Sequence, residues 1–142
     1  MPIAIASDHA GYELKEKLKT LFAQVDWLDL GTHREDSVNY PEYGFAMGAA
    51  ITEGSAEKGI VICGSGIGIS IAANRFPAVR AALCTNATMA RLSRQHNDAN
   101  VLALGSRIIG LEVAQECVTI FLNTPFEDAR HQTRIDMLNV RH

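Results

Sequence analysis

The sequence predicts an α/β protein in which helices cover both faces of a five-stranded parallel sheet. Two observations lead to this prediction. Short apolar runs alternate along the chain with segments of helical periodicity. Neither internal repeats nor low-complexity segments interrupt that alternation, which is typical of strands joined by crossover helices. Because 142 residues fit one ordinary domain, we expect a single domain over residues 1–142.

The first part of the chain contains two predicted strands and two predicted helices. Pro2–Ala6 is apolar at nearly every position, as expected of a short buried strand. Over residues 14–22, apolar side chains recur at i, i+4, i+7 and i+8, which is the stripe of an amphipathic helix. Val25–Leu30 predicts a second strand that ends before a glycine. Pro41–Glu53 predicts a second helix with proline in its first turn.

The central part of the chain repeats this order. Gly59–Cys63 is a continuous apolar run, typical of a central parallel strand that is buried on both faces. A glycine-rich turn and a helix over about residues 68–75 follow it, and Val79–Cys84 predicts the fourth strand. Asn86 is suited to cap a helix that runs to about residue 96. Asn100–Leu104 predicts the fifth strand.

Two more helices are predicted after the fifth strand. Leu111–Leu122 has a mixed apolar face, and Pro125 ends this helix. Glu127–Leu138 predicts the last helix. Because no strand follows it, we expect this C-terminal helix to pack on a partner subunit. The complete prediction is a three-layer α/β/α, Rossmann-like fold.

The composition excludes several classes of function. The chain has 13 basic and 16 acidic residues, and this net charge of −3 argues against a nucleic-acid-binding surface. No apolar run approaches the roughly 20 residues of a membrane-spanning helix, and the N-terminal sequence does not resemble a secretory signal. The three cysteines lie far apart without the spacing of a zinc site, so we expect a reduced, cytoplasmic protein.

The turn Cys63–Gly68 is the strongest local pattern, because parallel sheets bind ligands at the carboxyl ends of their strands. Its glycines allow main-chain N–H groups to point at an anion, and the start of a helix favours a thiolate. Cys63 alone is more readily interpreted as a small buried residue. Its place beside this turn favours a reactive thiol. Cys84 and Cys117 lack such a turn and are predicted to belong to the core.

Two histidines and an aspartate are further candidates. Asp8 and His9 directly follow the first strand, so we expect them at the same edge of the sheet as Cys63. In the structural alternative, Asp8 caps the first helix and His9 is a turn residue. His96 ends a predicted helix, where a histidine is often stabilised only by the helix dipole. An imidazole there can also give and take a proton near neutral pH.

Three arginines form the candidate anion-binding set. Arg107 follows the fifth strand, and Arg130 and Arg134 stand four residues apart in the last predicted helix. On one helix face they repel each other by a few tenths of a kcal/mol, so a solvated surface is the structural alternative. Two adjacent guanidiniums also suit a phosphate, which each of them binds with paired hydrogen bonds. His131 and Gln132 are expected to point elsewhere and are left out of the predicted site.

Several ordered segments together resemble the type B ribose-5-phosphate isomerases, whose wider family includes galactose-6-phosphate isomerase subunits. The segments are Ser7–Gly11, Ile62–Asn74, Leu92–Asp98, Gly105–Arg107 and Arg130–Arg134. The match extends along nearly the whole chain. The resemblance implies that a sugar phosphate is the ligand. It also implies interconversion of ribose 5-phosphate and ribulose 5-phosphate through an enediolate, without a metal or cofactor.

The resemblance implies roles for individual residues. Cys63 is the base that moves the proton between C2 and C1, and His96 is the acid and base that opens the sugar ring. Ser65 contributes to an anion hole for the enediolate. The main-chain donors of that hole belong to Gly64, Gly66, Ile67 and Gly68. The residues that hold the sugar and its phosphate are Asp8, His9, Asn97, Arg107, Arg130 and Arg134.

Two positions depart from the pattern of other family members. Ser65 stands where many relatives have threonine, and the hydroxyl group is kept. Another branch lacks the cysteine and uses a glutamate at the position of Ile69. Because Ile69 cannot accept a proton, this chain is similar to the members that use cysteine. The resemblance further implies a homodimer or homotetramer whose active sites are built from both subunits.

Two other functions remain as alternatives. The first is an isomerase of a six-carbon sugar phosphate, such as allose or galactose 6-phosphate. The second is a nucleotide-binding regulatory module that uses the glycine turn for phosphates. Against the second, the third glycine of the turn comes one place early for the dinucleotide fingerprint. In addition, the next strand ends in Cys84 and Thr85 and not in the acidic residue that binds a ribose hydroxyl.

Overall fold

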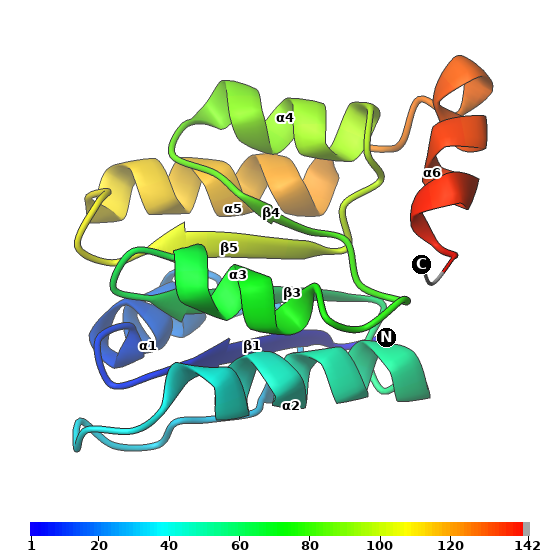
Figure 1. Cartoon of the computed structure of the whole chain (residues 1–142). Helices are drawn as coiled ribbons and strands as arrows, with labels where there is room; N and C mark the ends of the chain where they lie inside the picture. Colours follow the sequence, from blue (N-terminus) through cyan, green and yellow to red (C-terminus); the bar gives the residue numbers. More distant parts are fainter. Residues whose placement is uncertain (141–142) are drawn as a thin grey trace.

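A computed structural model describes residues 1–140 as one parallel sheet surrounded by helices (Figure 1). The strands are β1 (Ile3–Ser7), β2 (Trp27–Asp29), β3 (Lys58–Cys63), β4 (Ala81–Leu83) and β5 (Val101–Gly105). The helices are α1 (Tyr12–Leu21), α2 (Tyr40–Glu53), α3 (Ile67–Ala73), α4 (Ala87–Gln95), α5 (Leu111–Asn123) and α6 (Gln132–Leu138), and a 3₁₀ turn, η1 (Ala129–His131), precedes α6. The strand order is β2-β1-β3-β5-β4 with every pair parallel, so the predicted five-stranded sheet is confirmed.

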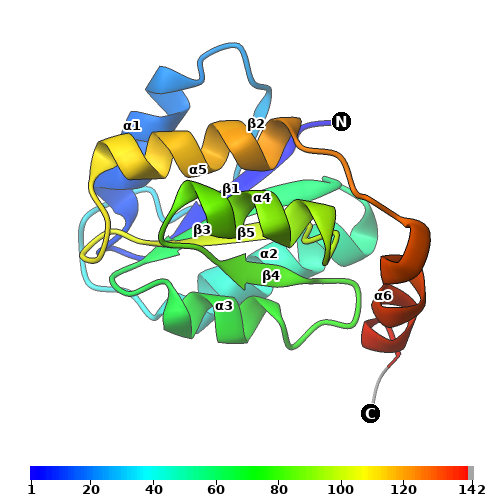
Figure 2. The ribbon, with the colours of Figure 1, turned by 90° about the horizontal axis from the view of Figure 1, so that it is seen from above.

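Two hydrophobic cores lie on opposite faces of the sheet and hold the three layers together. Neighbouring residues of a strand point to opposite faces, so Ile60 and Ile62 pack in one core while Val61 and Cys63 pack in the other. Helices α1, α4 and α5 cover the first face, and α2 and α3 cover the second (Figure 2). The continuous apolar sequence of β3 follows from this burial on both faces.

The edge strands and the last helix differ most from the sequence prediction. β2 and β4 each have three half-buried residues and pair with one neighbouring strand only. Both strands are therefore shorter than the sequence predicts. The prediction of one helix over Glu127–Leu138 is wrong. The main-chain N–H of Glu127 donates to the Gln95 carbonyl at 3.0 Å, and helical structure starts only with η1. This bond draws the segment before α6 against the end of α4.

Helix α6 stands apart from the three layers at the edge of the sheet where the strands begin (Figures 1 and 2). Ile135 is buried, whereas Met137, Leu138 and Val140 are more than half exposed. Arg80 Nη1 donates to the Asn139 side-chain oxygen at 2.8 Å and ties the end of α6 to the sheet. None of the helices in residues 1–140 is long and apolar enough to cross a membrane.

A buried ion pair joins α1 to the end of β2. Lys15 has no exposed surface, and its Nζ donates to the two carboxylate oxygens of Asp29 at 2.9 and 2.7 Å. Lys19 Nζ donates to the same carboxylate at 2.6 Å. Burial disfavours the ionised form of Asp29, but the hydrogen bonds from Lys15 and Lys19 outweigh it and hold the pKa of Asp29 below its ordinary value. Folding is therefore coupled to ionisation of this carboxyl group.

The Asp29→Asn variant is expected to lose about 3 kcal/mol of unfolding free energy at pH 7, because the charge of Lys15 remains buried without its main partner. The pKa of Asp29 is lower in the folded than in the unfolded state, where a carboxyl group titrates near about pH 4. Its stabilising contribution is therefore complete above about pH 4 and is lost as the pH falls through the folded-state pKa.

Urea unfolding of the wild type and the variant between neutral and acid pH measures this difference. Glu13→Gln is the matched control, because it breaks the exposed pair of Glu13 with Lys17 and should change stability little. A difference between wild type and Asp29→Asn that persists undiminished in acid would contradict the proposed coupling.

Candidate active site

A cavity of about 450 Å³ opens at the carboxyl edge of the sheet, beside the ends of β1 and β3. β1 lies between β2 and β3, so the chain leaves β1 to one side and later returns on its other side. Ligands of parallel α/β sheets bind at such a switch point. Six of the sequence-predicted residues line this cavity: Asp8, Cys63, Gly64, Ser65, Ile67 and Gly68.

Cys63 is the last residue of β3, and its side chain is held by the turn that follows. The residue is only 5% exposed, and its Sγ accepts a hydrogen bond from the main-chain N–H of Gly66 at 3.2 Å. Gly66 has a φ of +79°, and a Cβ at this position would lie 2.6 Å from Leu83 Cδ1. Only glycine fits at this position. The glycine in the sequence therefore allows the turn to hold the N–H of Gly66 against the sulfur of Cys63. Donors of this kind stabilise a thiolate.

The hydroxyl of Ser65 engages the next amide of the turn. Ser65 Oγ accepts from the N–H of Ile67 at 3.1 Å. Two of the predicted anion-hole donors, the amides of Gly66 and Ile67, therefore have acceptors within the turn itself. An oxyanion that takes up the Ile67 amide must displace the Ser65 hydroxyl, which can then donate to the same oxyanion.

Asp8 and His9 hold the turn after β1 beside β3. Asp8 Oδ1 accepts from the N–H of Gly11 at 3.1 Å, and the N-cap of α1 is Gly11 rather than Asp8. A Cβ on Gly11 would lie 2.6 Å from the carbonyl oxygen of Ile62, so glycine allows this turn to contact β3. His9 Nδ1 accepts from the N–H of Val38 at 3.1 Å, which leaves the proton of the neutral ring on Nε2.

Arg107 lies at the same edge, next to the glycine turn. Its main-chain N–H donates to the Gly64 carbonyl at 2.9 Å. A Cβ on Gly64 would lie 3.2 Å from Arg107 Nη1, so the guanidinium rests against this glycine. The carboxyl-edge group of predicted residues thus comprises Asp8, His9, Cys63, Gly64, Ser65, Gly66, Ile67, Gly68 and Arg107.

The remaining predicted residues belong to the end of α4 and to the segment of η1 and α6, which lie at the opposite edge of the sheet, where the strands begin (Figure 1). α4 runs back along the sheet, so His96 and Asn97 come just before β5 starts. Arg130 and Arg134 belong to η1 and α6, and both are exposed. We call these four residues the amino-edge group. The length of a five- or six-residue strand, about 17–20 Å, separates this group from Cys63.

The structure therefore does not bring all predicted residues together within one chain. Within a single subunit, Arg130 and Arg134 do not line the cavity of Cys63. The physical reason is the direction of α4, which returns the chain to the amino edge before the last arginines are reached. Only Arg107 of the three predicted arginines lies beside the glycine turn.

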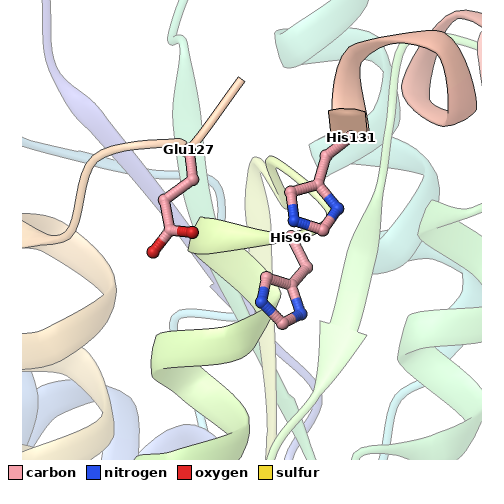
Figure 3. A group of neighbouring side chains, drawn as sticks. All are labelled: His96, Glu127 and His131. Carbon is pink, nitrogen blue, oxygen red and sulfur yellow. The ribbon is translucent and has the colours of Figure 1, made fainter. Parts of the chain in front are cut away.

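His131 is a residue of the amino edge that sequence reasoning missed (Figure 3). Its ring stacks on His96 with 4.5 Å between the centroids and 21° between the planes. It is 6% exposed, and burial, together with Arg130, His96 and Arg134, lowers its pKa. The interpretation that His131 points away was wrong, because η1 turns this residue towards the end of α4. The only sign of its position in the sequence was the spacing of four residues between Glu127 and His131.

One more lining residue and the two other cysteines complete the description of the site. Tyr40, which sequence reasoning also missed, lines the cavity, and a Cβ on Gly68 would lie 2.6 Å from its Cε1. Cys84 and Cys117 are almost fully buried in one of the two cores, as predicted. Burial, together with the neighbouring Cys117, raises the pKa of the Cys84 thiol to about 11. Cys63 is thus the cysteine that faces a cavity.

The sequence matches the model of the Ribose/Galactose Isomerase family over residues 3–138. The chain belongs to this family. The matched residues include the carboxyl-edge group and the amino-edge group in full. Both ends of the sheet are therefore part of the ribose/galactose isomerase fold, and the chain has the parallel sheet and the covering helices of that fold.

Individual ribose/galactose isomerases are similar to the chain over nearly its whole length. Ribose-5-phosphate isomerase B of Escherichia coli (strain K12) is 43% identical over 138 residues, which cover 96% of this chain and 93% of that protein. Ribose-5-phosphate isomerase B of Clostridium thermocellum has a TM-score of 0.95 at 48% identity, and covers 98% of this chain and 95% of that structure. The structure of the Mycoplasma genitalium enzyme with bound ribulose 5-phosphate has a TM-score of 0.93 at 39% identity. The match covers 97% of this chain and 93% of that structure.

Proposed function

We propose that the chain is an aldose–ketose isomerase that interconverts ribose 5-phosphate and ribulose 5-phosphate, acting as a single domain over residues 1–142. The observation that carries the proposal is the thiol of Cys63 at the switch-point cavity, with the N–H of Gly66 3.2 Å from its sulfur. Similarity to ribose-5-phosphate isomerase B of E. coli, at 43% identity, supports the five-carbon substrate. So does similarity to the M. genitalium enzyme, whose structure contains ribulose 5-phosphate.

The thiolate of Cys63 removes the proton from C2 of the open-chain aldose and returns it to C1, and the oxygen on C1 takes a proton from the oxygen on C2. Removal of a proton next to a carbonyl places negative charge on that oxygen, where preorganised donors are worth several kcal/mol. The Ser65 hydroxyl and the amide of Ile67, which lie in the same turn as the thiol, are the donors for this charge. The reaction needs no metal and no cofactor in this mechanism.

A second copy of the chain supplies the other half of each site. One subunit contributes the carboxyl-edge group, and the amino-edge group comes from its partner in a homodimer or homotetramer. An uncovered apolar rim beside the cavity supports this arrangement, because such patches are typical of protein interfaces. Its members line the cavity and are each more than 40% exposed: Tyr40, Ile67 and Ile71. The exposed end of α6 fits the same role as a helix that packs on a partner.

In the assembled site, His96 opens the sugar ring by moving a proton between the ring oxygen and the anomeric hydroxyl. Asp8, His9 and Asn97 hold the sugar hydroxyls. Arg107 of one subunit binds the phosphate together with Arg130 and Arg134 of the other. Phosphate binding then holds C1 and C2 over the sulfur of Cys63.

The proposed compartment is the cytoplasm. All three cysteines are free thiols in the structure, which is typical of proteins from reducing compartments.

Isomerisation of five- and six-carbon sugar phosphates by the purified chain tests the proposal. We expect kcat/KM for ribose 5-phosphate to exceed that for allose or galactose 6-phosphate by more than about tenfold, since the phosphate and the reacting carbons must span a fixed distance. A preference for a six-carbon substrate would support the alternative isomerase. Tight nucleotide binding without any isomerisation would support the regulatory module and overturn the proposal.

A further inference from the structure

Three side chains at the amino edge form a cluster with the chemistry of a metal site (Figure 3). One ligand atom each from His96, Glu127 and His131 lies within 4.8 Å of the other two. Within residues 1–140 this is the one group of three or more histidine, cysteine or carboxylate side chains that converge in this way. The two imidazole rings lie face to face, with the Glu127 carboxylate beside them.

We propose that His96, Glu127 and His131 bind a divalent transition-metal ion such as Zn²⁺, and that the bound ion inhibits the isomerase by occupying the imidazole of His96. The binding half of this proposal stands on the geometry of the cluster. The inhibitory half rests on the proposed function, which assigns ring opening to His96.

The ligand set suits zinc and its neighbours in the transition series. Two imidazole nitrogens and one carboxylate oxygen are the protein ligands of zinc sites that keep a fourth position open. Metal–ligand bonds of about 2.0–2.2 Å place tetrahedral ligand atoms roughly 3.4 Å apart, so the cluster must close by somewhat more than about 1 Å. Glu127 is exposed and His96 is half-buried, so both side chains can rotate towards a common ion.

The unpaired nitrogen of His131 independently points to a ligand. Its Nε2 is buried and has no hydrogen-bond partner among the residues that the structure describes. The residue itself is 6% exposed, so water has little access to it. Buried polar atoms without a partner are rare in native proteins. A metal ion between the rings and the carboxylate supplies the missing contact.

Main-chain hydrogen bonds fix the two segments that carry the ligands. The N–H of Glu127 donates to the carbonyl of Gln95, the residue before His96, at 3.0 Å. The N–H of His131 donates to the carbonyl of Asp128 at 2.8 Å and closes the turn between Glu127 and His131. The backbone is thus ordered before an ion arrives, and only side chains need to move.

The charge around the cluster sets the kind of site that we expect. Arg130 directly precedes His131 in η1, and Arg134 follows it in the first turn of α6, so their positive charge opposes a cation at this site. Binding should therefore be weaker than at a structural zinc site, and a chelator should reverse it. A reversible inhibitory site fits these charges better than a permanent structural one.

Titration of the full-length Cys63→Ser protein with Co²⁺ tests the binding half. The substitution removes the accessible thiol as a competing ligand, and the visible absorption of Co²⁺ reports nitrogen and oxygen ligands. We expect one Co²⁺ per chain, displaced by Zn²⁺. Glu127→Gln and His131→Phe, each added to this background, should weaken binding by at least about tenfold. The matched control is Glu53→Gln, an exposed carboxylate at the end of α2, which should leave the affinity unchanged.

Because Glu127 is exposed, Glu127→Gln should fold like the parent protein. The affinity of this variant therefore tests the site even if His131→Phe fails to fold. Absence of Co²⁺ binding to the parent protein, or an affinity unchanged by Glu127→Gln, would overturn the site.

Activity of the wild type with added Zn²⁺ tests the inhibitory half. The rate with ribose 5-phosphate should fall as the site fills and recover with a chelator, and Glu127→Gln should need at least about tenfold more Zn²⁺. An undiminished rate with the site filled would overturn inhibition and leave the binding result intact. If the metal-free chain does not isomerise ribose 5-phosphate at all, the proposed function fails, while the Co²⁺ titration still decides the site.

Discussion

Cys63→Ala is expected to abolish turnover of ribose 5-phosphate, lowering kcat by at least about a thousandfold. A positioned general base contributes about 10²–10⁴ to the rate, and alanine leaves no group in the turn that can accept the C2 proton. Steady-state kinetics in both directions measures the loss. Binding of a non-reacting sugar phosphate, measured by calorimetry, should remain, since the arginines and the amides of the turn are unchanged.

Cys84→Ala is the matched control for this experiment. It also removes a buried thiol at the end of a strand, but Cys84 faces a hydrophobic core and no part of the cavity. We expect it to lower the unfolding temperature and to preserve kcat. Activity of Cys63→Ala within about tenfold of the wild type would exclude the thiol as the base, whatever the control shows.

The sequence predicted the features of the fold that depend on periodic burial. β3 lies between two cores, so every residue from Gly59 to Cys63 is buried and the apolar run is unbroken. The glycine turn was predictable for a related reason, since the positive φ of Gly66 excludes other residues. Both features are local consequences of steric and hydrophobic demands, and such demands are visible in one segment at a time.

The features that the sequence did not predict depend on contacts between distant segments. His131 faces His96 because the main chain at Glu127 is bonded to Gln95, 32 positions earlier, and no periodicity encodes that bond. The extent of the edge strands depends in the same way on how many neighbours each strand has. Tyr40 reaches the cavity because Gly68 leaves room for its ring on another helix.

The separation of Cys63 from His96 follows from topology rather than from local pattern. A helix that follows a parallel strand must return the chain to the edge where the next strand starts. His96 closes such a helix, so it lies about 17–20 Å from the end of β3, and no rotation of a side chain spans that distance. If both residues act on one sugar, two copies of the chain have to meet.

Mixing two inactive variants is therefore expected to restore activity. In a heterodimer of Cys63→Ala and His96→Asn, one site carries both lesions and the other carries none. Random exchange makes about half of the dimers heterodimers, with one intact site of two, so about a quarter of the wild-type activity should return. The assay starts from cyclic ribose 5-phosphate, because His96→Asn impairs the opening of the ring.

The control is a mixture of Cys63→Ala with Ser65→Ala, whose lesions lie in the same half-site. Every site of that heterodimer carries one of the two lesions, so mixing should add nothing to the residual activity of Ser65→Ala. Light scattering before and after exchange confirms that dimers are present. Recovery in the first mixture alone requires that Cys63 and His96 come from different subunits. No recovery in either mixture, with exchange demonstrated, would mean that Cys63 and His96 act within the same chain, and the proposal of sites shared between subunits would fail.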